Sequence, residues 1–221
     1  MKKVVVIGDS HATLYSNNPE RNRGQWIDPS LENLFDTRWI GPVTFWRLCR
    51  DQEKFIDFDS DIRYNQCGIN MTTRVEGDHQ ILIVLGEIDV RCNILKFGYE
   101  NYRETVDEMC LSIKKFLEMY SNRFSIHLQS IVPTIYRENF PPTKPLFPFV
   151  GNDSERRDVT IYFNRKLKEM SEELSIGYFN IFDLYADNDD MMILEKSDHI
   201  VHAMKTPELE QYIREYWREI L

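Results

Sequence analysis

The chain has 221 residues, a formal net charge of −9 and a sequence pI near 5.1. This length suits one α/β domain, and we interpret residues 1–221 as a single domain without a linker. The acidic balance argues against a nucleic-acid partner, which needs a basic patch, and we interpret the short basic clusters at residues 21–23 and 156–157 as solvated surface.

Cysteine use and hydropathy predict a cytoplasmic protein. Four cysteines, at positions 49, 67, 92 and 110, form no C-x-x-C pair, which favours free thiols in a reducing compartment. Only four apolar residues precede Gly8, too few for a signal-peptide core. No apolar run approaches the roughly 20 residues that span a membrane. We therefore expect no membrane partner, and we also expect no cofactor. We expect no metal, because the acidic stretch 187–190 lacks the glycine and terminal glutamate of a calcium loop. The oligomeric state is left open.

In chain order, strand-like runs alternate with helical patterns. Residues 3–7 predict the first strand and residues 81–85 a central strand, since both runs are continuously apolar. Further on, the pattern predicts a helix at 99–120, a strand at 123–131, a helix at 160–174, a strand at 178–182 and a last helix from residue 206. Residues 31–35 and 45–49 read as short helical or irregular pieces, and 55–64 could hold an edge strand. This alternation predicts a mainly parallel sheet.

A serine follows the first strand in the turn Gly8-Asp9-Ser10-His11. Sites of α/β sheets assemble at the carboxyl ends of the strands, so Ser10 would open onto a crevice. That position suits a nucleophile. Asp9 and Ser10 could equally form a turn and cap the following helix.

The far end of the chain supplies an acid and a base, in Asp198, His199 and His202. A serine hydroxyl needs a neutral imidazole to take its proton and a carboxylate to orient that imidazole. The order Ser, Asp, His, without a G-x-S-x-G elbow, resembles the SGNH, or GDSL-like, hydrolase superfamily. The resemblance implies a three-layer α/β/α, flavodoxin-like fold with Ser10, Asp198 and His202 as the catalytic triad. His199 is the alternative base, because the spacing from Asp198 to His202 is one residue longer than the usual D-x-x-H.

Two further segments match this family. Gly68 resembles the glycine whose N–H helps to bind the oxyanion, and Gly86 and Asp89 fit the G-x-N-D block within the segment GEIDVR. Ile88 stands where that block has asparagine, and losing one such donor typically costs about 3 kcal/mol of transition-state stabilisation. Glu87 and Arg91 are the nearby polar candidates to reshape the pocket. Asp9 and His11, beside the serine, complete the predicted substrate-binding set.

The resemblance implies an esterase that works through an acyl-serine, on a carbohydrate O-acetyl ester or a similar small substrate. A glycan O-acyltransferase with the same residues and a catalytically inactive binding module remain alternatives. The proline-rich, aromatic segment 135–158 could be a substrate lid or wall, or a plain surface insertion. We expect a structural role for His127, whereas Asn164 is open between a family-like site position and a helix-face polar residue.

Overall fold

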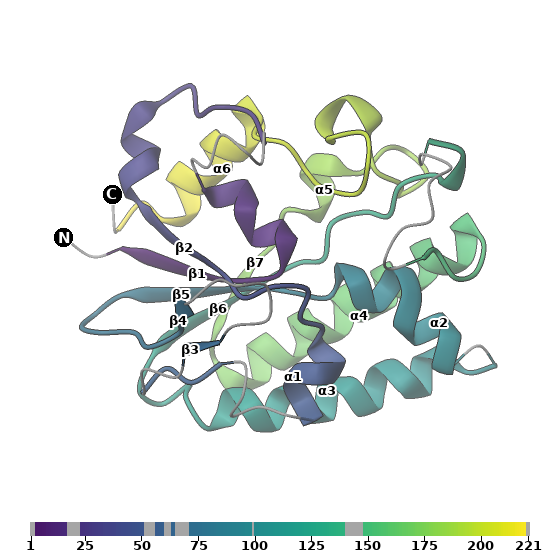
Figure 1. The fold of residues 1–221 in the computed structure, drawn as a ribbon, viewed down its shortest axis with the longest axis horizontal. Helices are drawn as coiled ribbons and strands as arrows, with labels where there is room; N and C mark the ends of the chain where they lie inside the picture. The colour runs from purple at the N-terminus through teal and green to yellow at the C-terminus, as the bar shows by residue number, and fades with distance from the viewer. Residues whose placement is uncertain are drawn as a thin grey trace.

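A computed structural model describes residues 3–16, 23–50, 56–59, 63–64, 71–98, 100–139 and 148–219. Within these ranges the structure is a three-layer α/β/α sandwich, with a five-stranded parallel sheet between two layers of helices (Figure 1). The strand order is β2-β1-β5-β6-β7, which puts β5 at the centre as the sequence predicts. The strands are β1 (Val4–Gly8), β2 (Phe35–Trp39), β5 (Gln80–Val84), β6 (Ser125–Gln129) and β7 (Gly177–Phe179), with a separate antiparallel pair, β3 (Arg63–Tyr64) and β4 (Met71–Thr72).

The two helical layers differ in size. One face of the sheet is covered by α1 (Phe45–Arg50), α2 (Ile94–Phe97), α3 (Tyr102–Glu118) and α4 (Asp153–Leu174), and the other by α5 (Phe182–Tyr185) and α6 (Pro207–Tyr216) (Figure 1). The 3-10 helices span Ser10–Tyr15, Pro29–Asn33, Arg137–Asn139 and Leu194–Lys196, and a π-helix spans Asp89–Asn93.

The alternation of apolar side chains along β1 divides the core into two parts. Val5 and Ile7 lie in the cluster under α3 and α4, whereas Val4 and Val6 lie in the cluster that contains α6 residues such as Leu209. Successive side chains of a strand point to opposite faces, so a strand covered on both sides must be apolar throughout. This is why the run at residues 4–7 predicts a buried strand.

Several predicted boundaries move. The predicted strand at 123–131 is shorter, Ser125–Gln129, and the last one covers Gly177–Phe179, with α5 taking the residues from Phe182. The helix expected from residue 160 already begins at Asp153, because Asn152 and Glu155 form a capping box at its start. The predicted loop 135–158 was therefore too long.

The strand β2 was not predicted from the sequence, which placed a short helical or irregular piece at residues 31–35. Its sequence, FDTRW, buries only Phe35, because it is the edge strand beside β1 and its other side chains are half exposed. The edge strand expected within 55–64 corresponds only to β3, which pairs with β4 outside the main sheet. Within the described residues no helix is both long and apolar enough to cross a membrane.

Candidate active site

Three side chains from the two ends of the chain form a hydrogen-bonded series at the carboxyl end of β1. Ser10 Oγ lies 2.8 Å from His202 Nε2, and His202 Nδ1 lies 2.8 Å from Asp198 Oδ2. Ser10 begins the 3-10 helix directly after β1, with Asp9 as the residue that caps it. The tight approach of β1 to β5 requires glycine at position 8, where a Cβ would lie 2.0 Å from the Val84 carbonyl oxygen. The serine is therefore both in a capped turn and in reach of a base.

The extra residue between Asp198 and His202 is absorbed by a left-handed turn. His199 has φ of +58° and is exposed. Asp198 Oδ1 then accepts hydrogen bonds from the N–H groups of Ile200, Val201 and His202, at 3.0, 3.1 and 3.0 Å. Of the two candidate histidines, only His202 lies against Ser10.

Arg23 is a member of the site that the sequence interpretation missed. Its guanidinium pairs with Asp198 Oδ2, and its Nε donates to Thr13 Oγ1 at 3.3 Å. Interpreting the cluster at 21–23 as solvated surface was wrong for Arg23, which is buried. No local pattern could reveal this pair, because its partners are 175 residues apart in sequence.

The electrostatics of the site favour a neutral imidazole beside an ionised carboxylate. Burial lowers the pKa of His202, and the neighbouring His11 and Arg23 also lower it, whereas the hydrogen bond that Asp198 accepts from His202 acts to raise it. Burial tends to raise the pKa of Asp198, but the bonds and charge of His202, together with Arg23, hold it well below its usual range. A neutral histidine can accept a proton at neutral pH, as a general base must.

Asp9 and His11 form a second acid–histidine pair beside the first. Asp9 Oδ1 accepts the backbone N–H of His11 at 2.8 Å and lies 3.1 Å from His11 Nδ1. The rings of His11 and His202 are 4.6 Å apart at their centroids. Both members of the pair are buried, so they lie beneath the site rather than at its solvent-exposed side.

The segment GEIDVR follows β5 and lies beside these residues. Gly86 has φ of +111°, a conformation that favours glycine, and an added Cβ would press on Ile131. Glu87 and Arg91 form an ion pair, with Arg91 Nη2 3.0 Å from Glu87 Oε2. Although burial acts to raise the pKa of Glu87, the charge of Arg91 holds it below the usual value. Ile88 is buried in the core and has no side-chain donor to offer.

Asp89 has a structural position rather than a place in the crevice. Its carboxylate is fully buried and accepts the N–H of Phe45 at 2.7 Å and of Trp46 at 3.4 Å, at the start of α1. Asn93 Nδ2 adds a third bond at 3.4 Å. The prediction that Asp89 binds substrate is therefore replaced by a role in anchoring α1. Burial raises the pKa of Asp89 to about 7 despite these bonds.

This raised pKa makes a testable prediction about stability. Between the ordinary pKa of an aspartate and the folded value near 7, the folded state keeps a proton that the unfolded state has lost, so stability falls as pH rises, by about 1.4 kcal/mol per pH unit at most. Asn at position 89 does not titrate and still accepts the Phe45 N–H. We expect the unfolding free energy of Asp89→Asn, relative to wild type, to rise steadily from pH 4 to pH 7 in urea titrations. A difference independent of pH would contradict the assignment.

The remaining predictions concern Gly68, the predicted lid and Arg156. Gly68 and residues 140–147 of the predicted lid lie outside the described residues. Beyond them, the Phe149 ring lies 5.5 Å from the Arg91 guanidinium and 4.7 Å from that of Arg156. Arg156, expected at the surface, is fully buried and donates to the Gly151 carbonyl at 2.8 Å. The end of the proline-rich segment thus packs beside GEIDVR.

Several polar residues serve the scaffold. Asn164 bonds both the N–H and the C=O of Ile131, at 2.7 and 2.8 Å, and so holds the chain that leaves β6. His127 lies between the Tyr216 hydroxyl and Gln80, at 2.9 and 2.8 Å, in line with a structural role. Cys92 and Cys110 are free thiols.

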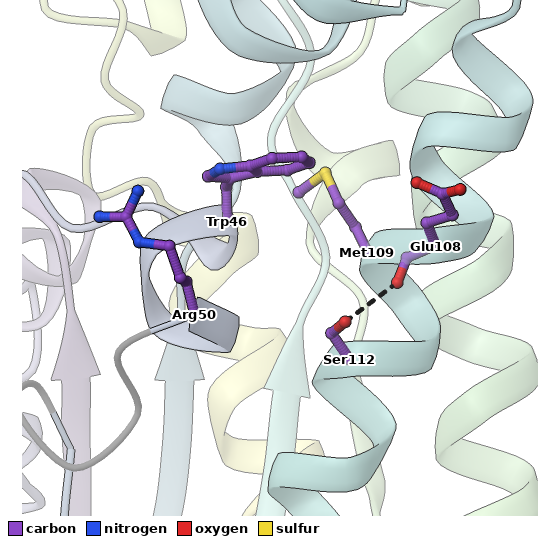
Figure 2. Close-up of a pocket in the computed structure, with 5 residues that line it drawn as sticks. All are labelled: Trp46, Arg50, Glu108, Met109 and Ser112. Atoms are coloured by element: carbon purple, nitrogen blue, oxygen red, sulfur yellow. Dashed lines mark hydrogen bonds between the residues drawn. The ribbon is translucent and has the colours of Figure 1, made fainter.

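A pocket of about 200 Å³ opens elsewhere, in the layer formed by α1 and α3 (Figure 2). Its lining residues are Trp46, Arg50, Glu108, Met109 and Ser112. The Trp46 indole is partly exposed and stacks on Phe97, with ring centroids 6.1 Å apart. No lining residue of this pocket belongs to the Ser10 site.

Comparison with solved structures finds proteins that share this fold over nearly the whole chain. An acetylxylan esterase from Geobacillus stearothermophilus superposes with a TM-score of 0.57 at 15% identity, over 99% of this chain and 94% of that one. A protein assigned as an acylhydrolase from Bacteroides fragilis gives 0.59 at 14% identity, over 99% and 86%. A protein assigned to the lipolytic G-D-S-L family, from Desulfitobacterium hafniense, gives 0.55 at 15% identity, over all of both chains.

By sequence alone, neither a protein-family model nor a curated protein matches the chain. The likeness to these esterase, acylhydrolase and G-D-S-L family structures is thus one of fold, at identities of 14–15%.

Proposed function

We propose that the protein is a serine-dependent esterase that works through an acyl-serine intermediate. The observation that carries this proposal is the continuous series from Ser10 Oγ through His202 to Asp198, with both links at 2.8 Å. The neighbours support it, since an acetylxylan esterase with this fold has been solved as two variants described as catalytic mutants, one lacking a serine and one a histidine.

The proposed reaction has two halves. Ser10 Oγ attacks the ester carbonyl carbon while its proton passes to His202 Nε2. When the tetrahedral intermediate collapses, the bond to the alcohol breaks and His202 gives the proton to the departing oxygen, leaving an acyl group on Ser10. Water then attacks this acyl carbon and gives a proton to His202, and collapse releases the acid and returns the proton to Ser10.

Charge on the carbonyl oxygen needs fixed donors. The Ser10 N–H is one candidate, because it begins a 3-10 helix and none of the described residues accepts a hydrogen bond from it. We propose the Gly68 N–H as the second, on the family resemblance. The buried Ile88 side chain supplies no third donor, and the neighbouring side chains of Glu87 and Arg91 are paired with each other.

For the substrate we propose an O-acetyl ester of a carbohydrate, a class supported by the acetylxylan esterase among the structural neighbours. Transfer of the acyl group to a sugar hydroxyl would use the same three residues with an alcohol in place of water. Mass spectrometry after incubation with an acyl donor and candidate sugars separates these outcomes, because transfer adds an acyl mass to the sugar whereas hydrolysis yields only free acid.

Labelling with a fluorophosphonate probe tests the proposed nucleophile. Ser10 Oγ displaces fluoride from phosphorus, so we expect one label per chain, located on the peptide that holds Ser10. The label should be absent from Ser10→Ala and present in Ser16→Ala, a nearby serine whose Oγ donates to the Thr13 carbonyl. Equal rates of p-nitrophenyl acetate hydrolysis by wild type and Ser10→Ala would refute the proposal and favour a binding module.

A further inference from the structure

Both ring nitrogens of His11 face acceptors. Nε2 lies 3.1 Å from the Val201 carbonyl oxygen, which can only accept, so Nε2 carries a proton. Nδ1 lies 3.1 Å from Asp9 Oδ1, the oxygen that also accepts the His11 backbone N–H. With Asp9 ionised, both nitrogens must donate, and the ring is then an imidazolium. A neutral ring would leave one of these two buried contacts without a proton unless Asp9 supplied it.

The Val201 peptide lies between the two acid–histidine pairs. Its N–H donates to Asp198 Oδ1 at 3.1 Å, and its C=O accepts from His11 at 3.1 Å. The next residue is His202, whose N–H also binds Asp198 Oδ1. His11 therefore binds the same short loop as Asp198, through the Val201 C=O rather than through the N–H groups.

We propose that His11 is a positioning residue, held as an imidazolium by Asp9, which fixes the loop that bears His202 and keeps His202 neutral through the positive charge beside it. The inference rests on the proposed function, since it concerns the base of that reaction. Its Asp9 partner is fully buried, with Oδ2 making no hydrogen bond in the described structure. Such a carboxylate gains from a cation next to it.

The charges around His202 give the sign of the effect. Asp198 contacts it from its own loop, Arg23 lies behind Asp198, His11 faces its ring, and Glu87 acts from the segment after β5. Asp198 and Glu87 favour an imidazolium at position 202, whereas Arg23 and His11 oppose it. The carboxylate of Asp9, with a lesser contribution from Glu87, raises the pKa of His11 although its burial acts in the other direction. The two histidines are thus driven to opposite protonation states.

Nitrogen NMR of the wild-type protein tests the charge without any substitution. The chain has only five histidines, so long-range ¹H–¹⁵N spectra can be assigned by comparison with single variants. We expect both ring nitrogens of His11 to be protonated at pH 7, while His202 is neutral there. An unprotonated Nδ1 or Nε2 on His11 at pH 7 overturns the proposal. This readout needs no turnover, so it stands even if Ser10 fails to take the fluorophosphonate label.

Two neutral substitutions then separate charge from anchoring. His11→Gln can reach toward the Val201 carbonyl, and His11→Asn can keep the bond to Asp9. We expect both to move the acidic limb of kcat/KM to higher pH, lowering kcat/KM about tenfold on that limb, and His11→Gln to retain the larger plateau kcat. His79→Gln, a control outside the site, should leave the profile unchanged. Profiles that coincide with wild type in both His11 variants overturn the electrostatic role, and equal plateaus overturn the anchoring role.

Discussion

Asp198→Asn is expected to lower kcat for ester hydrolysis about 10⁴-fold with little change in KM. The Asn oxygen can still accept the three N–H groups that now bind Asp198 Oδ1, so the loop should keep its shape. Its amide group, however, would replace the oxygen that faces His202 Nδ1. An N–H donor there forces His202 to accept at Nδ1 and to carry its proton on Nε2, where it can no longer take the proton of Ser10.

Steady-state kinetics on p-nitrophenyl acetate measures this loss, with circular dichroism to verify the fold. Asp187→Asn is the matched control, because Asp187 Oδ1 also accepts backbone N–H groups of its own turn, those of Asp189 and Met191, without a histidine beside it. We expect the control to stay within about twofold of wild-type kcat, as surface changes usually do. An Asp198→Asn enzyme that keeps a tenth of the activity would show that this carboxylate does not orient the base.

Gly8→Ala should have the largest effect on stability, with an unfolding free energy lower by about 3 kcal/mol or more. A Cβ at this position would lie 2.0 Å from the Val84 carbonyl oxygen and 3.0 Å from the Val84 Cβ. Both belong to the central strand β5, which cannot retreat because it pairs with β6 on its other side. The strand β1 must shift instead, and Ser10, two residues further on, shifts with it.

Urea denaturation gives the loss of stability, and hydrolysis by the remaining folded protein reports the displacement of Ser10. The same substitution at Gly77 serves as the control. There an added Cβ comes no nearer than 3.7 Å to another residue, but φ is +70°, so only the left-handed conformation is penalised, by about 1 kcal/mol. If both alanine variants lose the same stability, the close approach of β1 to β5 does not explain the glycine at position 8.

The expected effects of these changes show how the site depends on two kinds of support. The parallel pairing of β1 with β5 brings the turn at Ser10 beside the segment that starts at Gly86. The loop from Asp198 to His202 is instead held by side chains, with Asp198 bonding its N–H groups and His11 its Val201 carbonyl. Backbone pairing thus positions the proposed nucleophile, whereas buried polar contacts position the proposed base.

The sequence by itself determined the strands that are buried on both faces and the turn that carries Ser10. The runs at 4–7 and 81–84 have no polar residue, and only a covered strand tolerates such composition. The edge strand β2 was not predicted, because four of its five side chains are only half buried. The start of α4 was missed although its capping residues, Asn152 and Glu155, are three apart in the sequence.

Only the tertiary structure decided which polar residues meet. The spacing between Asp198 and His202 left two histidines open, and a left-handed residue at 199 selects His202. Arg23 pairs with Asp198, 175 positions away in the sequence. Asp89, which was predicted to bind substrate, instead accepts a backbone N–H at the start of α1. Periodicity records which side of an element is buried, but hydrogen bonds between distant segments depend on how those elements pack. That is why the sequence could propose Ser10 as a nucleophile, whereas the residues around its proposed base are known only from the fold.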